Sequence, residues 1–599
     1  MRRLSVAVLL TACLTAPVPI AAKPVAAAHA ASHRSADAAF AALSKRYIDG
    51  LARLDPSHAT ALGDHRFDSA VTDMSAAGRA RADAFSQQML GALGRIDRSR
   101  LSRENQVDAA LLDNSLRYGL WTNSKLQNWA WDAQIYTETA GTSLYSLAAR
   151  DFAPWRDRLR AATARMERIP RLLAQARASL VPARVPPIYA TTVQKQNSGI
   201  VSIVDEMFVP QRSALSPAEA TRFDAAFAGL KAAVAEHQKW LDTVLVPNAK
   251  GDFRLGPTLY DQKLRFALAS PLTRAEIKAR ATRALGETRA EMYALSRRLL
   301  AGKPGAPDLP ETPNADQQQK AIEAALELSY ANRPSRDGVM AAAAEALRKT
   351  TDFAARAGFV TMPTSPVKII PVPEYQRGVA VAYCDSPGPL EQGLDAFYMV
   401  SPLPDDWTDA QVASYLREYN SSMIHDLTAH EAMPGHYLQG FHANRYKSLL
   451  RAVLASGPFV EGWAVYGEGM MADAGYLDGD PLFRLTVLKM RLRSVTNSLL
   501  DIGIQTEGMT REQAMDLMTR TAFQQEREAA GKWVRASLGS TQLLSYFVGY
   551  SEIMELREEA KKREGDRFSL KAFNDALLSH GSPPVHYVRA LMFDEPIPR

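Results

Sequence analysis

The sequence predicts a mainly α fold with one small β-sheet, and three observations indicate it. Long stretches, such as residues 284–300 and 409–427, place apolar residues at helical spacing beside charged faces. Several helix starts carry a recognisable capping pattern. Residues 360–404, in contrast, are rich in β-forming residues and are interrupted by Pro and Gly. At 599 residues, the chain is long enough to bury a large core.

The N-terminus has the three parts of an export signal. Arg2 and Arg3 precede the apolar run 4–12, and Ala- and Pro-rich sequence then leads to small residues ending at Ala30. The sequence therefore predicts a signal peptide over residues 1–30 and a periplasmic location. Beyond it, no apolar run is long enough to span a bilayer.

Cysteine usage offers an alternative to simple secretion. The segment LTAC (10–13) resembles a bacterial lipobox, and cleavage before Cys13 would attach a lipid there. We favour cleavage near Ala30, because the apolar stretch continues past Cys13 to Ile20. Cys384 is then the one remaining cysteine, so no intramolecular disulfide can form, and we expect it to be a buried, unreactive thiol in a strand.

Charge excludes one class of partner. The chain carries 71 Lys and Arg against 65 Asp and Glu, and these residues are scattered along it. Such a small, dispersed excess is not the pattern of a nucleic-acid-binding surface. We therefore expect no nucleic-acid partner.

Four helices have starts with a defined mechanism. A hydroxyl N-cap followed three residues later by Glu or Gln forms a capping box, which satisfies amide donors from both sides. The pattern occurs at Ser216–Glu219, Thr273–Glu276, Thr408–Gln411 and Thr510–Gln513. Four prolines in 303–314 cannot continue a helix, so this segment is either a loop within the fold or a boundary between lobes.

The predicted organisation has three parts after the signal. Residues 31–359 form a helical N-terminal region, 360–404 form the small sheet, and 405–599 form a second helical region. An edge strand can align an extended chain by main-chain hydrogen bonds, and we expect that role for a strand in 360–404.

The second helical region contains the parts of a hydrolytic zinc site. Such a site needs three imidazole or carboxylate ligands, an open position for water and a nearby carboxylate base. His430, Glu431 and His436 lie together, but a spacing of six would turn the second imidazole away on a straight helix. Pro434 and Gly435 between them predict a kinked or interrupted helix that returns His436 towards His430.

The third ligand has two candidates. Glu461 follows His436 by 25 residues, which leaves room for a loop and a returning helix. Glu468 lies on the same helical face, so it is either a rival ligand or a group that supports one.

Two longer motifs indicate a family. H-E-x-x-P-G-H-x-x-Q at 430–439 and E-G-W-A-x-Y-x-E at 461–468 resemble the bacterial domain-of-unknown-function 885 family, and the likeness covers most of the mature chain. That family resembles gluzincin metallopeptidases of the angiotensin-converting-enzyme and thimet-oligopeptidase kind. The resemblance implies two helical lobes flanking a deep channel, with His430, His436 and Glu461 as zinc ligands and Glu431 as general base.

The resemblance also extends downstream. Tyr546 and Tyr550 match a Y-x-x-G segment and its neighbour, and a tyrosine there could stabilise a developing oxyanion. Arg557 matches a following L-R pair and could bind a substrate carboxylate. The sequence departs from the family pattern at Gln505, where a His is usual, and in 538–544, which lacks the usual Pro-Gly.

The sequence thus predicts a zinc-dependent hydrolase of peptide or related amide bonds. One alternative is a secreted helical binding protein whose metal site has no catalytic role. Another is a zinc amidohydrolase that acts on small acylated amines. The remaining histidines, such as His425 and His580, are expected to be structural.

Overall fold

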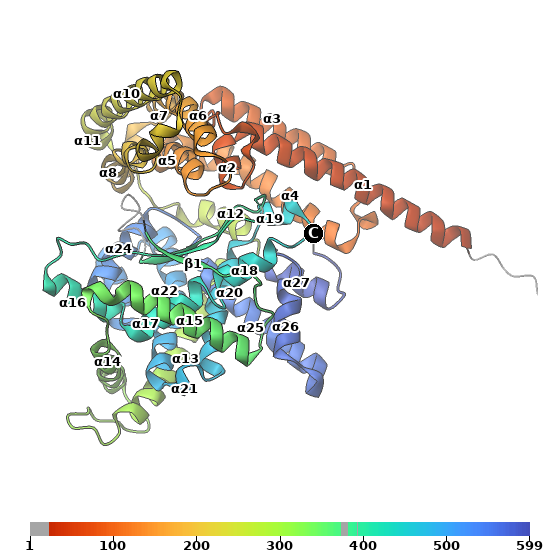
Figure 1. Cartoon of the computed structure of the whole chain (residues 1–599). Helices are drawn as coiled ribbons and strands as arrows, with labels where there is room; N and C mark the ends of the chain where they lie inside the picture. Colours follow the sequence, from red (N-terminus) through yellow and green to blue (C-terminus); the bar gives the residue numbers. More distant parts are fainter. Residues whose placement is uncertain (1–22, 373–380, 392, 599) are drawn as a thin grey trace, which may run out of the picture.

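The structure, a computed structural model, describes residues 23–372, 381–391 and 393–598, with side chains from Arg34 onward. Residues 1–22 of the predicted signal peptide, including the alternative lipid-attachment residue Cys13, lie outside the described residues. The mainly α fold is confirmed: helices make up most of the described chain, beside one small sheet (Figure 1). No helix in the described ranges is both long and apolar enough to cross a membrane.

The N-terminal helices form a body of their own, drawn in red to yellow in Figure 1. One apolar core joins buried residues between Ala133 and Leu245, and a second joins the first, third and fourth helices and also includes Leu450 from later in the chain. These helices are α1 (Lys23–Leu54), α2 (Pro56–Ala61), α3 (Ala76–Leu93), α4 (Arg103–Trp121), α5 (Gln134–Ala148), α6 (Trp155–Met166), α7 (Ile169–Ser179), α8 (Pro187–Gln196), α9 (Gly199–Ile203), α10 (Pro217–Trp240) and α11 (Val246–Asn248).

The remaining helices pack as a second body. They are α12 (Gly256–Leu268), α13 (Arg274–Leu300), α14 (Ala315–Ala331), α15 (Val339–Ala357), α16 (Asp409–Glu418), α17 (Ser421–Glu431), α18 (His436–Ala443), α19 (Leu449–Val453), α20 (Gly457–Asp473), α21 (Tyr476–Gly479), α22 (Pro481–Thr506), α23 (Arg511–Asp516), α24 (Glu526–Ser537), α25 (Leu544–Glu564), α26 (Leu570–Leu578) and α27 (Val585–Met592). Three cores place residues 256–357 in this body: one unites α13 and α14 with α22, one unites α12 with α25, and one unites α15 with α17 and α20. Residues 256–357 thus pack with the helices that follow the sheet, and the predicted division into 31–359, 360–404 and 405–599 stays a prediction.

Local sequence accounts for the helix starts. All four predicted capping boxes are present, at the starts of α10, α13, α16 and α23. A fifth, which the sequence analysis did not identify, joins Asn314 to Gln317 at the start of α14. The proline-rich segment 303–314 is a loop that packs back on α13, since the Tyr293 hydroxyl donates to the Pro310 carbonyl at 2.5 Å.

The predicted sheet is present and has three strands in the order β1-β3-β2. Strand β1 (Lys368–Pro371) pairs in parallel with β3 (Phe397–Val400), and β2 (Ala382–Asp385) pairs antiparallel to β3. β2 is thus an edge strand, and it contacts α17. Figure 1 shows the sheet between the two helical bodies.

Candidate metal centre

The predicted interruption between His430 and His436 is present. Helix α17 ends at Glu431, and α18 begins at His436. A Cβ on Gly435 would lie 1.7 Å from the His430 carbonyl oxygen, so only glycine allows this close turn. The Trp463 indole donates to the Pro434 carbonyl at 2.9 Å and thereby ties the turn to α20.

The turn brings the two imidazoles together, and α20 adds a carboxylate. The rings of His430 and His436 lie 4.7 Å apart, nearly perpendicular to one another. Glu461 Oε2 lies 3.7 Å from His430 Nε2 and 3.5 Å from His436 Nε2. Glu431 completes the group, with a ligand atom within 4.8 Å of those of both histidines.

Glu468 occupies a different position from Glu461. Its Oε1 lies 2.6 Å from His430 Nδ1, on the opposite side of the ring from Nε2. A carboxylate at that nitrogen fixes the ring and leaves Nε2 available for a metal ion, as in many zinc proteins. The geometry therefore favours Glu461 as the third ligand and Glu468 as its support. Asp426, four residues before His430 and fully buried, adds a further carboxyl group behind Glu468.

The electrostatics of the group suit a cation. Burial acts to lower the pKa of His430, but Glu461 and Glu468 outweigh it and raise that pKa well above its usual value. Burial acts to raise the pKa of Glu461, yet His430 and His436 hold it well below its usual range. Negative charge thus concentrates where the two Nε2 atoms converge.

The donor set fits zinc. Glu461 Oε2 and His436 Nδ1 are buried, and neither has a hydrogen-bond partner among the described residues. This ionised oxygen faces two imidazole nitrogens without a hydrogen bond to either, and a cation bound between them would satisfy it. Tetrahedral zinc with ligand bonds of about 2.0–2.1 Å holds its ligand atoms about 3.3 Å apart, which is close to the spacings observed here.

Strand β2 positions the candidate base. The Cys384 amide donates to Glu431 Oε2 at 3.0 Å, so the edge strand holds the carboxylate beside the histidines. Burial raises the pKa of the Cys384 thiol to about 12, which agrees with an unreactive thiol. The thiol lies 3.4 Å from the Ser386 hydroxyl.

Glycines in two motifs bring α25 against α20. A Cβ on Gly549 would lie 1.7 Å from the Pro458 carbonyl oxygen, and one on Gly462 would lie 2.3 Å from the Gly549 carbonyl carbon. This close crossing places Tyr546 with its ring 6.4 Å from that of His430. Burial and the Glu461 carboxylate raise the pKa of Tyr546 above its usual value, so its phenol stays protonated.

The histidines and glutamates of the candidate metal centre lie at the wall of a cavity of about 930 Å³. His430, Glu431, His436, Glu461 and Tyr546 all line it. Its other walls come from β2, α16, α22 and α24, with Thr192 and Gln196 of α8 contributed by the N-terminal body. Both helical bodies therefore contribute residues to the wall of this cavity.

Comparison with known proteins identifies the family. The family model for bacterial proteins of unknown function, DUF885, matches residues 56–592. The chain belongs to the DUF885 family. No curated protein matches the sequence.

Two solved structures resemble this DUF885 chain over nearly their whole length. A "putative lipoprotein of unknown function" from Shewanella oneidensis is 34% identical, with a TM-score of 0.79 over 92% of this chain and 99% of that chain. A "putative lipoprotein" from Colwellia psychrerythraea is 17% identical, with a TM-score of 0.75 over 94% of this chain and 99% of that chain. The second likeness concerns the fold alone.

Two residues expected at the site of this DUF885 protein lie elsewhere. Tyr550 packs near Arg491, whose guanidinium lies 5.5 Å from its ring centre, and Arg557 lies 5.6 Å from the Tyr466 ring centre. Neither lines the large cavity. One helical turn separates Tyr550 from Tyr546, but the crossing at Gly549 directs only Tyr546 towards the histidines.

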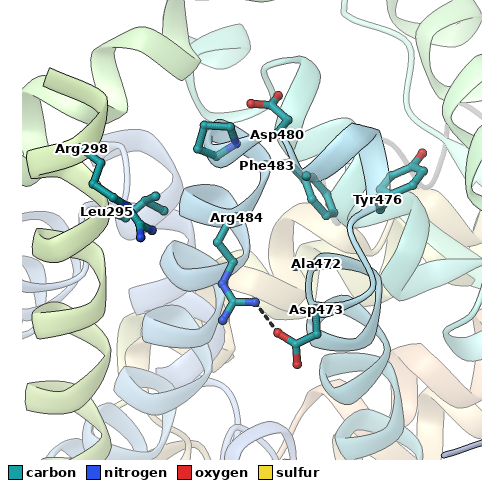
Figure 2. Close-up of a pocket in the computed structure, with 10 residues that line it drawn as sticks. Leu295, Arg298, Ala472, Asp473, Tyr476, Asp480, Phe483 and Arg484 are labelled. Carbon is teal, nitrogen blue, oxygen red and sulfur yellow. Dashed lines mark hydrogen bonds and ion pairs between the residues drawn. The ribbon is translucent and has the colours of Figure 1, made fainter. Parts of the chain in front are cut away.

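A smaller cavity of about 310 Å³ lies beside α21 (Figure 2). Arg484 lines it and pairs with Asp473, and the same guanidinium lies 2.7 Å from Glu291. None of the candidate site residues lines this cavity. Arg484 and Asp473 thus satisfy one another, and we assign this cavity no chemistry.

The family motifs also contain residues with structural roles. Gln439 donates to the Ser582 hydroxyl, and Gln505 joins the Leu255 amide to the Gly539 carbonyl at 3.0 and 3.1 Å. The departure at Gln505 therefore concerns the packing behind the cavity. His425 bonds the Tyr476 hydroxyl at 2.8 Å and His580 lies 3.2 Å from Glu104, so both are placed as structural groups.

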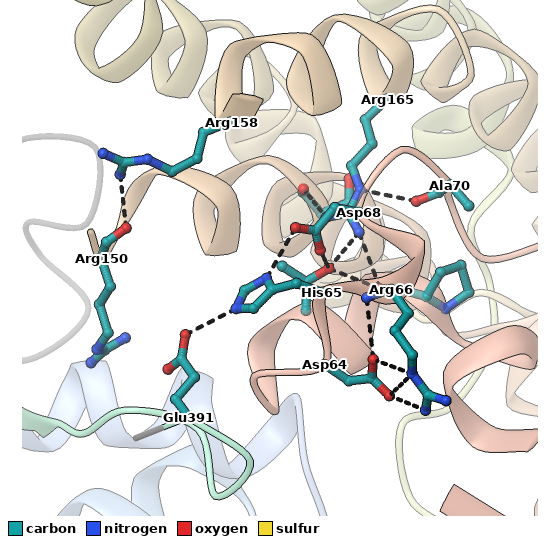
Figure 3. Close-up of polar contacts among 12 residues, drawn as sticks. Asp64, His65, Arg66, Asp68, Ala70, Arg150, Arg158, Arg165 and Glu391 are labelled. Atoms are coloured by element: carbon teal, nitrogen blue, oxygen red, sulfur yellow. Dashed lines mark hydrogen bonds and ion pairs between the residues drawn. The ribbon is translucent and has the colours of Figure 1, made fainter. Parts of the chain in front are cut away.

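Polar contacts hold the segment after β2 against the N-terminal body (Figure 3). His65 lies 3.0 Å from Asp68 and 3.2 Å from Glu391, so each ring nitrogen faces a carboxylate. The guanidinium of Arg150 lies 2.7 Å from Asp385 at the end of β2. The N-terminal body thus fixes the strand that positions Glu431.

Proposed function

We propose that this protein is a zinc-dependent hydrolase of peptide or related amide bonds, with a site like that of the gluzincin metallopeptidases. One observation carries the proposal. Two imidazole Nε2 atoms converge on Glu461 Oε2, at 3.7 and 3.5 Å, at the wall of a large cavity with Glu431 beside them.

His430, His436 and Glu461 would hold the metal ion. Zinc in such a site lowers the pKa of a bound water and polarises a substrate carbonyl. Glu431 accepts a proton from the attacking water and returns it to the leaving amine, and the Cys384 amide keeps its carboxylate in place. The Tyr546 phenol, protonated because its pKa is raised, donates a hydrogen bond to the developing oxyanion.

Replacing the base tests the proposal directly. Glu431→Gln keeps a similar shape but cannot take the proton, so we expect hydrolysis of a mixed peptide library to fall by about 10²- to 10⁴-fold. Zinc content should remain one ion per chain, because His430, His436 and Glu461 are intact. Full hydrolysis by the zinc-loaded Glu431→Gln protein would refute this mechanism.

A panel of small acylated amines separates the two amide-cleaving alternatives. Hydrolysis of these compounds without cleavage of any peptide would identify an amidohydrolase. Zinc binding without hydrolysis of either class would indicate a binding protein with a structural metal.

We further propose that the protein is exported and carries a lipid at Cys13. Support comes from the lipobox-like residues 10–13 and from the 34% identical Shewanella oneidensis protein, which is described as a putative lipoprotein. Mass spectrometry of the mature N-terminus should find a lipid-modified Cys13, and Cys13→Ala should abolish it. A mature chain that begins near residue 31 would contradict the anchor.

A further inference from the structure

One buried lysine in the large cavity forms no salt bridge with the described residues. Lys532 of α24 is 2% exposed and lines the cavity. Its ammonium makes one hydrogen bond, to Asn497 Oδ1 at 3.0 Å. Within the described part of the chain, no carboxylate lies within ion-pair distance of it. An ammonium has three donors, and a buried charge without a partner is costly.

The nearest carboxylate is already occupied. Glu528 pairs with Arg493 and lies 3.1 Å from the Arg535 guanidinium, and it accepts the Tyr419 hydroxyl at 3.1 Å. Two arginines and a phenol thus share its two oxygens. Glu528 still attracts Lys532, but it lies beyond ion-pair distance and its oxygens already have closer partners.

The other acidic groups along this wall also have donors of their own. Glu418 lies 2.9 Å from Lys489 and accepts the Gln525 amide at 3.0 Å. Asp501 accepts the Tyr260 hydroxyl at 2.8 Å and the Thr541 amide at 3.0 Å. Each of these two carboxylates therefore has a closer partner than Lys532.

We propose that Lys532, held by Asn497, binds a carboxylate of the substrate, so that the preferred substrates are peptides with a free carboxyl group. This inference rests on the proposed peptide hydrolysis. The carboxylate is either the C-terminal one or that of an acidic side chain. Its oxygens would accept the unused Lys532 donors within the same cavity that holds Glu431 and Tyr546.

The charge state of Lys532 is consistent with this role. Burial and the neighbouring Arg493 lower its pKa well below the usual value. An entering carboxylate would oppose this shift, because an opposite charge at contact favours the charged form. Lys532 has no salt bridge among the described residues, and a bound carboxylate would supply one.

Matched peptides test the inference. The zinc-loaded protein is assayed on one peptide series with a free or amidated C-terminus, and on a second series, amidated throughout, that carries Glu or Gln near the scissile bond. We expect about 10- to 100-fold higher kcat/KM for the member that bears the recognised carboxylate, as a charged hydrogen bond predicts. The pair that shows this preference identifies the source of the carboxylate.

Two variants tie the preference to Lys532. Lys532→Met should remove the preference, because kcat/KM should fall more for the carboxylate peptide than for its neutral counterpart. Asn497→Asp keeps the lysine but places a carboxylate beside it, so this variant should also lose the preference. It provides the test if the Lys532→Met protein does not fold. Lys562→Met, at an exposed position of α25, should leave the preference intact.

Binding separates this inference from the proposed function. If no peptide is cleaved, calorimetry of the same peptides with the Glu431→Gln protein decides the question. Tighter binding of the carboxylate peptide, lost in Glu431→Gln/Lys532→Met, would support the subsite even though the hydrolase proposal fails. Equal cleavage or binding of all pairs, or a preference that survives Lys532→Met, would overturn it.

Discussion

At the scale of single residues, the two nitrogens of the His430 ring distinguish the candidate metal ligand from the supporting glutamate. His430 faces Glu468 with Nδ1 and Glu461 with Nε2. Sequence spacing placed both glutamates on one helical face, so it could not separate them. The direction of the ring depends on how α17 and α20 cross, which is a tertiary property.

Removing the supporting carboxylate should weaken the metal site without abolishing it. We expect Glu468→Ala to lower zinc affinity by about 10- to 100-fold, as is usual for groups that orient a metal ligand. Glu461→Ala should lose zinc more completely. Competition with a chelator of known affinity measures both, with Glu311→Ala in the exposed loop 303–314 as control. A larger loss for Glu468→Ala than for Glu461→Ala would reverse the assignment.

Tyr546 should matter for the rate and not for the metal. Tyr546→Phe removes the oxyanion donor, and we expect kcat to fall by about 10²- to 10³-fold while zinc content is unchanged. Tyr550→Phe is the matched control, since Tyr550 does not line the cavity. The role of Tyr546 is contradicted if the two variants have equal activity.

At the scale of helices, glycines set the distances that bring the site together. Gly435 closes the turn between α17 and α18, and Gly462 and Gly549 allow α20 and α25 to cross in contact. The crossing places the Tyr546 phenol beside the histidines. The motif glycines are thus packing residues, and the motif side chains next to them carry the chemistry.

A methyl group at that crossing should be strongly destabilising. Gly549→Ala would force α25 away from the Pro458 carbonyl, and we expect a loss of at least about 2 kcal/mol in the free energy of unfolding. Gly286→Ala, in the exposed middle of α13 with open space around it, should instead be neutral or stabilising by up to about 1 kcal/mol. Urea denaturation compares the two, and similar unfolding midpoints would contradict the packing argument.

Local features were predictable from sequence, and long-range ones were not. Capping boxes and the proline-glycine interruption act within a few residues, so the four helix starts and the kink before His436 follow from the sequence. Lys532 and Asn497 come from α24 and α22, and nothing in the spacing of the two residues predicts their contact. Asp426 could have been found, because it lies one helical turn before His430.

At the scale of the whole molecule, the N-terminal body supports the site from a distance. His65 and Arg150 hold the segment that includes β2 and Glu391, and β2 in turn holds Glu431. Thr192 and Gln196 extend the cavity wall from the same body. The two bodies therefore need to stay docked for the base to keep its position.

This docking should depend on pH through His65. Burial acts to lower the pKa of His65, but Asp68 and Glu391 raise it from 6.5 to about 9. A raised pKa stabilises the folded state fully below about pH 6.5, and that contribution is lost as the pH rises through 9. Wild-type stability should therefore fall by on the order of 2 kcal/mol over this range. The His65→Gln variant should lack this pH-dependent contribution to the free energy of unfolding. If urea denaturation gives the same pH dependence for the variant and the wild type, the role of His65 is contradicted.

The central claim is that His430, His436 and Glu461 hold one zinc ion with a position left open for water. X-ray absorption at the zinc edge, with metal analysis of the purified protein, tests it most directly. We predict one zinc per chain, with two imidazole nitrogens and oxygen ligands at about 2.0–2.2 Å, and loss of zinc from a His430→Ala/His436→Ala variant. A protein that binds no zinc, or a zinc spectrum unchanged in that variant, would contradict the account.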